Sequence, residues 1–240
     1  MPFLEVGVPK LLLPGGLAVV VGAAAAAGVS FVDAEFATTT SPAVGTITVP
    51  AGAAGGDLAV LLCGSNDDDF DETQLAPAGW SQLGSTNTYA GTCESLIATR
   101  TVTSGDLGGT WDVPGSFSYN EAHHIVAVFH SGAGTPVVDA VTPFSDYPGT
   151  DPTTTHTFPA VTTTVADTLL VLMTQTRPAG TAWTSPPGDA TAIQAFVGSL
   201  TAMWAGIAPQ AAIGSSGTRT IVHDLAYSKF TSWTLAIAAP

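Results

Sequence analysis

The sequence contains very few basic residues. Only 5 of its 240 residues are Lys or Arg, against 19 Asp and Glu, so the net charge is 5 − 19 = −14. The basic residues stand far apart, at Lys10, Arg100, Arg177, Arg219 and Lys229. Nucleic-acid binding needs clustered positive charge, and a uniformly negative chain repels phosphate polymers. We therefore exclude nucleic acid as a partner.

Charged residues of both signs and cysteines are also scarce. Charged residues make up 10% of the chain and hydrophobic residues 45%, which excludes a disordered acidic chain because such chains are poor in apolar residues. The surface must then consist largely of Thr, Ser, Gly and Ala. Two cysteines, Cys63 and Cys93, are too few for a disulfide scaffold, and the sequence leaves open whether they pair.

Sequence motifs of catalysis are missing as well. The chain contains no G-x-S-x-G, no H-E-x-x-H and no phosphate-binding loop. A glycosidase needs two carboxyl groups that meet in space, and besides Glu72 the predicted sandwich offers only Glu94 and Glu121 as glutamates. We expect a protein that is not an enzyme and has no catalytic residues.

The most apolar stretch lies at the N-terminus, in residues 7–32. Its outline is that of a secretory signal, and roughly 20 apolar residues also suffice for a membrane span. Pro14-Gly15-Gly16 interrupts the stretch, however, and Lys10 is its only positive flank. We interpret residues 1–36 as a hydrophobic attachment arm without a membrane span. The side chains that we expect to bind other protein chains are Leu11, Leu12, Leu13, Leu17, Val19, Val20 and Val21.

The rest of the chain contains an internal repeat. An aspartate opens a short apolar run twice, at Asp57 in DLAVLLC and at Asp167 in DTLLVLM, and 167 − 57 gives a spacing of 110. Pro-Gly corners and further strand-like segments follow both runs in the same order. A repeat at one fixed spacing indicates a duplicated structural unit. We therefore divide residues 37–240 into related halves, at about 37–131 and 150–240.

Each half is typical of β-structure. Short apolar runs bounded by Gly and Pro predict buried strands, and most of the 26 glycines and 17 prolines fall between such runs. Residues 190–205 have some helical character, but Gly198 and the aromatic content favour strands. Short strands without crossover helices predict an all-β fold, an antiparallel jelly-roll-like β-sandwich. Two small domains are the alternative to one sandwich.

The densest polar cluster, SNDDDFDE, covers residues 65–72. Ca²⁺ takes 6–8 oxygen ligands, so Asp67, Asp69 and Asp71 are the candidate metal ligands. The cluster lacks the fixed glycine and the distal glutamate of an EF-hand loop, and we interpret it as a solvated acidic loop. We expect no cofactor and no resident metal, with Ca²⁺ as the ion to test.

The histidines do not form a metal-binding pattern. His123 and His124 are neighbours, and neighbours on a strand point to opposite faces, so they do not chelate one ion. We interpret them and His130 as structural or interfacial residues. His156 and His223 are expected at strand edges, where the sequence gives them no acidic or sulfur partner.

The tryptophans are the residues best suited to bind a ligand. Exposed aromatic rings on a β-sandwich would stack on sugar rings, whereas a core position near turns is the competing interpretation for Trp80 and Trp111. The five tryptophans are Trp80, Trp111, Trp183, Trp204 and Trp233.

The GDLAVLL strand, the PAGW corner at residues 77–80 and the later DTLLVL strand together resemble β-sandwich structural proteins of tailed phages and gene transfer agents. The resemblance covers residues 36–240 and rests on this pattern alone. It implies a virion component: a capsid decoration or cement protein, a head spike, or part of a tail tip or fibre. It also implies contacts with other virion proteins and with further copies of the chain, often as a trimer.

Two functions from different classes follow. We expect a non-enzymatic virion structural protein that is anchored by its N-terminal arm. The alternative is a carbohydrate-binding or adhesin-like module, extracellular or on a cell surface, or a tail-tip or fibre component that binds a host surface glycan. The two differ in where the apolar surface goes, into neighbouring chains or into an open groove lined by Trp and Asp.

Overall fold

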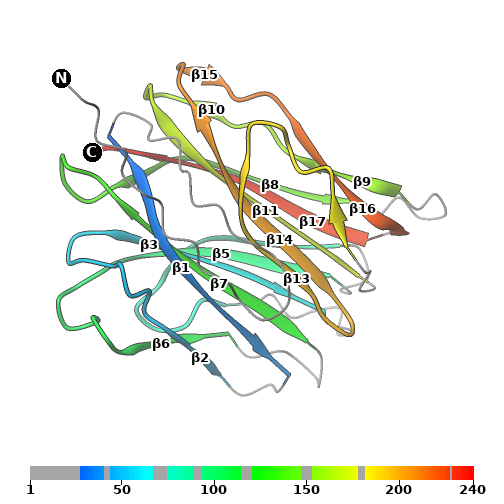
Figure 1. Cartoon of the computed structure of the whole chain (residues 1–240), viewed down its shortest axis with the longest axis horizontal. Helices are drawn as coiled ribbons and strands as arrows, with labels where there is room; N and C mark the ends of the chain where they lie inside the picture. The colour runs from blue at the N-terminus through cyan, green and yellow to red at the C-terminus, as the bar shows by residue number, and fades with distance from the viewer. Residues whose placement is uncertain are drawn as a thin grey trace, which may run out of the picture.

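The computed structural model describes residues 28–40, 44–66, 75–88, 93–114, 121–146, 153–177, 182–227 and 229–240. Every regular element within these ranges is a β-strand, and the paired strands run antiparallel. Most strands follow the long axis of the molecule (Figure 1). The all-β antiparallel sandwich that the sequence predicts is therefore confirmed.

Two five-stranded sheets form the middle of the molecule. The first large sheet contains, in spatial order, β1 (Ser30–Thr39), β7 (Ala122–His130), β3 (Leu58–Ser65), β5 (Glu94–Thr101) and β4 (Ser81–Asn87). The second large sheet contains β8 (Val137–Asp146), β17 (Lys229–Ala238), β11 (Thr168–Arg177), β14 (Ala202–Gln210) and β13 (Thr191–Val197). The spatial order is the same in both sheets. The first strand of the half lies at one edge, the last strand of the half lies next to it, and the remaining strands follow.

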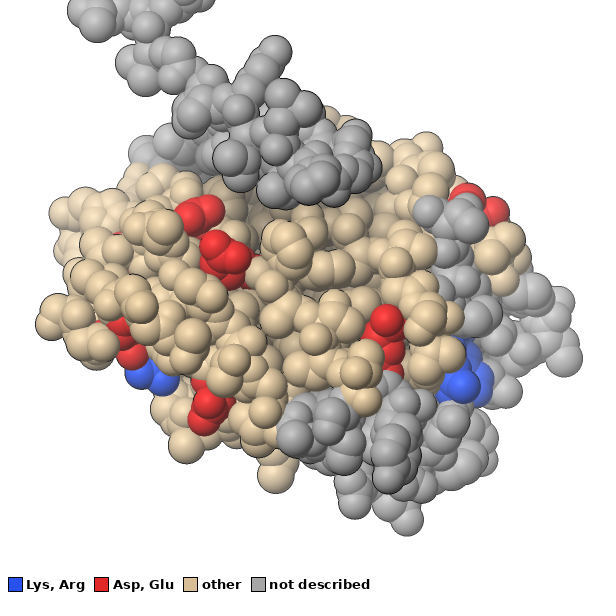
Figure 2. Space-filling model, turned by 60° about the horizontal axis from the view of Figure 1, so that its bottom comes forward, with Lys and Arg blue, Asp and Glu red and all other residues tan. Residues whose placement is uncertain are grey.

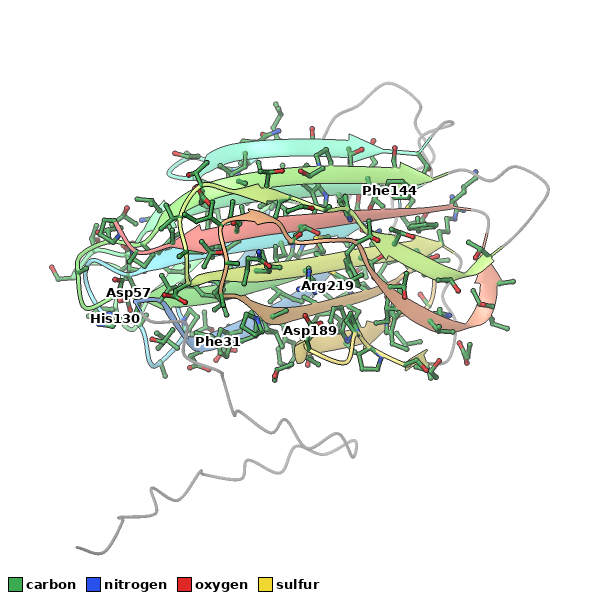
Figure 3. The ribbon with its side chains drawn as sticks, turned by 90° about the horizontal axis from the view of Figure 1, so that it is seen from above. Phe31, Asp57, His130, Phe144, Asp189 and Arg219 are labelled. Carbon is green, nitrogen blue, oxygen red and sulfur yellow. The ribbon has the colours of Figure 1, made fainter. Side chains whose placement is uncertain are left out.

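Smaller sheets cover the outer faces. The first small sheet consists of β2 (Gly45–Thr48) and β6 (Thr110–Val113). The second small sheet consists of β12 (Trp183–Thr184), β16 (Arg219–Tyr227) and β9 (Thr153–Phe158). A further pair joins β10 (Thr162–Thr163) to β15 (Gly214–Ser215). The sandwich therefore has more than two layers (Figure 3).

The two large sheets pack face to face around a central core. Val60 and Leu62 of β3 meet Val171 and Met173 of β11 in one apolar cluster, and all four are fully buried. Trp233 of β17 fills the same cluster. Because residues of both halves build this core, neither half is an independent small domain, and the structure favours the single folded unit.

Each half also has an outer core between its large sheet and its small sheet. Ala59 and Leu61 of β3 point to the first outer core, and Leu170 and Leu172 of β11 point to the second. Both faces of β3 and β11 are therefore buried. This explains why these strands have continuous apolar sequences and not the alternation of a half-exposed strand.

The strand irregularities also match between the halves. An extra residue bulges from β4 at Leu83 and from β13 at Ile193, and 193 − 83 gives 110. A second pair of bulges lies at Val32 in β1 and at Asp139 in β8, where 139 − 32 gives 107. Bulges redirect a strand and are specific structural features. The halves share strand order and bulge positions, and their origin as related copies stays a prediction.

The boundary between arm and sandwich needs a correction. The sequence analysis ended the arm at residue 36, but residues 30–36 belong to β1 and pair with β7. Val29 is already buried in the central core, with 1% of its surface exposed. A strand cannot be shared between a separate arm and the sheet, so the sandwich begins by residue 29.

The two ends of the sandwich differ. At the entry end, β1 begins beside the ends of β7 and β17, and a Cβ on Gly28 would lie 3.0 Å from the Cβ of Ala239. The C-terminus lies at this end (Figure 1). At the opposite end, β3 and β11 stop while β5, β7, β14 and β17 start. We call this the polar end because its interior contains buried polar side chains.

Candidate functional site

The residues that the sequence analysis assigned to binding lie outside the described residues. This applies to the arm residues Leu11, Leu12, Leu13, Leu17, Val19, Val20 and Val21, and to the metal candidates Asp67, Asp69 and Asp71. Their roles stay predictions. In the part of the chain that the structure does describe, no helix is long and apolar enough to cross a membrane.

At the polar end, one glutamine joins the two large sheets. Gln175 of β11 donates from Nε2 to the carbonyl of Ser65, at 2.6 Å, and to Oγ1 of Thr201, at 3.1 Å. Its side chain lies directly on Gly64 of β3, where any Cβ would overlap it. The close approach of β3 and β11 thus depends on glycine at this position.

Glu121 connects the first half to the β13–β14 hairpin of the second. Its Oε2 accepts hydrogen bonds from the backbone N–H groups of Leu200, at 3.0 Å, and Thr201, at 3.3 Å. The carboxylate lies over Gly198, and a side chain at that position would collide with it. These two hydrogen bonds and the contact with Gly198 hold the Glu121 side chain of the first half against the β13–β14 hairpin of the second.

His123 lies beside this carboxylate in a fixed tautomer. Its Nε2 is 3.3 Å from the carbonyl of Thr201, which can only accept, so Nε2 carries the proton and Nδ1 accepts from Thr38 Oγ1 at 3.0 Å. The ring stacks on Phe196 with 4.9 Å between centroids. Burial lowers the pKa of His123, although Glu121, 3.8 Å away, opposes this. His123 is therefore a neutral packing residue.

His124 points to the opposite face, as the strand geometry predicts. Its Nε2 lies 3.0 Å from Thr39 Oγ1, whereas its buried Nδ1 has no hydrogen-bond partner among the described residues. Burial lowers the pKa of His124 to about 3. The expectation that His123 and His124 do not chelate one metal ion agrees with this arrangement.

The polar end also contains buried amide atoms without partners. Oδ1 and Nδ2 of Asn66 and Oε1 of Gln175 make no hydrogen bond within the described part of the chain. Buried polar groups are nearly always paired, because an unpaired one costs about 1–3 kcal/mol. The polar end is therefore the part of the described interior where further hydrogen-bonding capacity is concentrated.

A second histidine pair lies in the outer core of the second half. His156 of β9 and His223 of β16 are both fully buried, and their ring centroids are 6.4 Å apart. The prediction that neither has an acidic partner is wrong for His223, whereas the described structure places no carboxylate against His156. They point inward beneath the second small sheet, and His223 Nδ1 lies 3.0 Å from Asp224 Oδ1.

At the entry end, an aspartate orients an exposed histidine. Asp57 is buried and accepts from Ala54 N at 2.8 Å, and its other oxygen lies 2.7 Å from His130 Nδ1 (Figure 3). The strand register places Ser30 opposite His130. This row has the residue types of a hydrolytic triad, but Ser30 and His130 form no hydrogen bond in the described structure. An activated serine needs that contact and oxyanion donors.

The tryptophans are not displayed for ligand binding. Trp80 and Trp111 form a buried edge-to-face pair with 5.5 Å between centroids, as expected for core residues. Trp204 and Trp233 are also buried, and half-buried Trp183 donates from Nε1 to the carbonyl of Phe196 at 3.3 Å. The aromatic stacking surface that the glycan-binding alternative needs is therefore not formed by these side chains.

Cys63 and Cys93 do not form a disulfide. Both are buried and neither is part of a disulfide, which decides the question that the sequence left open. Burial raises the pKa of Cys93 to about 12, and a thiol that stays protonated is a poor nucleophile and metal ligand. Among the described residues, no group of three or more His, Cys, Asp or Glu could hold a metal ion.

Comparisons with known proteins identify no relative. No protein-family model matches the sequence, and no curated protein or solved structure matches the chain. The function must therefore be argued from the geometry of the fold and its two ends.

Proposed function

We propose that this chain is a non-enzymatic structural protein of a tailed-phage virion, a capsid decoration or head-spike protein anchored by its N-terminal arm. The observation that carries the proposal is that the two ends of the sandwich differ. The apolar arm precedes β1 at the entry end, and the interlocked polar end lies at the other extreme of the long axis. A protein that attaches at one end and projects the other needs this division.

The geometry of the entry end supports attachment there. The chain enters the sheet at Val29, whose side chain is fixed in the central core, next to Ala239 near the C-terminus. An arm that continues into a residue buried in the central core is directly connected to the folded part of the chain. Fully burying one Leu or Val is worth roughly 1.5–3 kcal/mol, so burial of the seven apolar arm side chains by neighbouring chains would outweigh the entropy of ordering the segment, about 1–2 kcal/mol per residue, by a small margin.

The outer surface supports a role in an exposed assembly. Figure 2 shows a face that is mostly uncharged, with isolated carboxylates and two small places of Lys or Arg. The small sheets turn threonines outward, with Thr48 paired to Thr110 and Thr157 paired to Thr220. Paired threonines suit an exposed strand face. Such a surface stays soluble without offering a charged binding site.

The partners that follow from the proposal are other virion proteins and further copies of the chain, and the location is the virion. The experiment compares particles from cells that supply the full chain or a chain lacking residues 1–27, with the chain quantified by mass spectrometry. We expect the full chain to be incorporated into the particles and the truncated chain to be absent from them. The truncated chain keeps Val29 and β1, so it should still fold.

A matched control replaces Asp67, Asp69 and Asp71 by Asn in the full chain, which should incorporate normally. Normal incorporation of the truncated chain would place the attachment on the sandwich. Absence of the full chain from every particle would overturn the virion role itself.

A further inference from the structure

The first small sheet covers its half with apolar side chains. Ile47 of β2 lies opposite Trp111 of β6, and Val113 follows two residues later on the same face. All three are buried, with 2%, 3% and 0% of their surface exposed, respectively. Nothing in this group of three side chains titrates.

The second small sheet repeats this arrangement with two histidines. His156 of β9 lies opposite Ile221 of β16, as Ile47 lies opposite Trp111, and His223 follows two residues after Ile221. His156 therefore occupies the place of Ile47, and His223 occupies that of Val113. Both histidines are fully buried. The two halves thus differ in chemistry at corresponding positions of their small sheets, and His223 also pairs with Trp183 of β12, a third strand that the first small sheet lacks in the described structure.

Aromatic rings enclose the two imidazoles. Trp183 of β12 contacts both edge-to-face, with centroid distances of 5.3 Å to His156 and 4.5 Å to His223. Phe230 of β17 stacks on His156 at 4.2 Å. These contacts attach the second small sheet to the second large sheet, so the protonation state of the imidazoles affects the packing between the two sheets.

The hydrogen bonds fix which nitrogen of His156 would receive a proton. Thr174 Oγ1 donates to the carbonyl of Thr231 at 3.1 Å and accepts from Ser232 Oγ at 2.9 Å. Its single proton is thus used, and its contact at 3.2 Å with His156 must be donated by Nδ1–H. The site left for protonation is Nε2, which is buried and has no hydrogen-bond partner in the described structure.

The charged surroundings do not compensate a proton on His156. In the part of the chain that the structure describes, the carboxylate found beside the pair is that of Asp224, which lies 3.0 Å from Nδ1 of His223. The other elements packed on His156 contribute Thr174 from β11, Phe230 from β17 and Trp183 from β12, none of which titrates near neutral pH. Burial, with a smaller contribution from His223, lowers the pKa of His156 to about 3, and burial also lowers the pKa of His223.

We propose that the His156–His223 pair makes the second small sheet an acid-sensitive flap, which separates from β11 and β17 in mild acid while the first small sheet stays closed. Burial in the closed state disfavours protonation of both imidazoles, whereas in the open state they reach water and take up protons freely. Lowering the pH therefore shifts the equilibrium toward the open state.

The size of the shift follows from the two protonation equilibria. The reference pKa of histidine is 6.5, and that of closed-state His156 is about 3. Between pH 7 and pH 5, the open-to-closed ratio then rises by about 25-fold through His156 alone. His223 acts in the same direction.

Hydrogen exchange read by mass spectrometry on the full chain tests the proposal, with rates corrected for the pH dependence of intrinsic exchange. Between pH 7 and pH 5 we expect protection in residues 153–158 and 219–227 to fall by at least 10-fold. Protection in residues 45–48 and 110–113 should fall by much less than in the flap, and Trp183 emission should change when the flap opens.

The control variant comes from the chain itself. His156→Ile together with His223→Val installs the side chains of the first half and should abolish the acid-induced loss of protection. Unchanged protection of the wild-type flap at pH 5 would overturn the proposal, and so would an equal loss in both small sheets, which indicates global unfolding. Acid opening that persists in the folded double variant would also overturn it.

Discussion

The shared central core predicts that a change at the contact between the halves weakens the whole molecule. Trp233 of β17 is the clearest position, because its indole is 1% exposed and its Nε1 donates to Ser95 Oγ of the first half at 2.7 Å. The ring also lies on Gly84 of β4, where a Cβ would be 2.9 Å from it. Trp233→Phe removes the donor and part of the ring while keeping an aromatic side chain.

The expected loss can be worked out from these contacts. The hydrogen bond contributes about 0.5–1.5 kcal/mol, and leaving Ser95 Oγ without its donor adds to the cost. The missing ring atoms leave a cavity, for which large-to-small changes in cores cost roughly 1–2 kcal/mol at this change of size. Trp233→Phe should therefore lower the free energy of unfolding by about 2–4 kcal/mol.

Urea unfolding, followed by circular dichroism and by fluorescence, measures this loss. The matched control is Trp80→Phe in the first outer core, where the indole donates to the carbonyl of Asp112 at 3.1 Å. Both variants should shift one common transition. Two separate transitions, with Trp233→Phe moving only one of them, would refute the shared core, as would a loss below about 1 kcal/mol.

Three further outcomes follow from the polar end and the buried thiol. Because burial raises the pKa of Cys93 to about 12, thiol reagents should label it only in urea, and rapid labelling of the native protein would contradict its burial. Glu121→Gln should cost roughly 1–2 kcal/mol in chemical unfolding, because its bonds to Leu200 and Thr201 lose their charge, and an unchanged midpoint would argue against the junction. His124 stays neutral in the folded state, with a pKa of about 3, while the unfolded chain takes up a proton below pH 6.5. Stability should therefore fall by up to about 1.4 kcal/mol per pH unit between these values, and a flat stability profile would contradict this.

The central strands of the large sheets could be predicted because strands that are buried on both faces have continuous apolar sequences. The apolar run from Leu58 to Cys63 lies within β3, and the later run that begins at Thr168 lies within β11. Gly198 was used to exclude a helix in residues 190–205, and the structure forms β13 and the start of β14 there. The local sequence pattern is enough to predict such strands, because the polarity of each side chain reflects whether its position is buried.

The spacing of the two apolar runs in the sequence differs by one residue from the spacing of the strands that they form. The aspartate spacing of 110 aligns Leu58 with Thr168, but in the structure Leu58 faces Phe129 while Leu169 faces Ile237, and both pairs lie in the central core. Between β3 and β11 the structural spacing is therefore 169 − 58 = 111, whereas the bulges at Leu83 and Ile193 keep a spacing of 110. On a strand, one residue exchanges the two faces. A sequence alignment alone does not resolve that difference.

Contacts between the halves could not be predicted. Gln175 meets Ser65 across 110 residues of sequence, and Glu121 meets Leu200 across 79. The sequence around His156 gives no sign of its neighbour His223, because the two residues are 223 − 156 = 67 positions apart in the chain. The one available signal was the repeat itself, which places His156 where the first half has Ile47.

The most direct test of the proposed attachment uses Lys10, the one lysine of the arm. Amine cross-linking of assembled particles, with isotope-labelled and unlabelled chains mixed, separates links within a chain from links between chains. The account predicts that Lys10 is joined to lysines of other virion proteins or to a second copy of the chain. Cross-links from Lys10 only to Lys229 of the same chain would contradict it, because the arm would then be packed on its own sandwich.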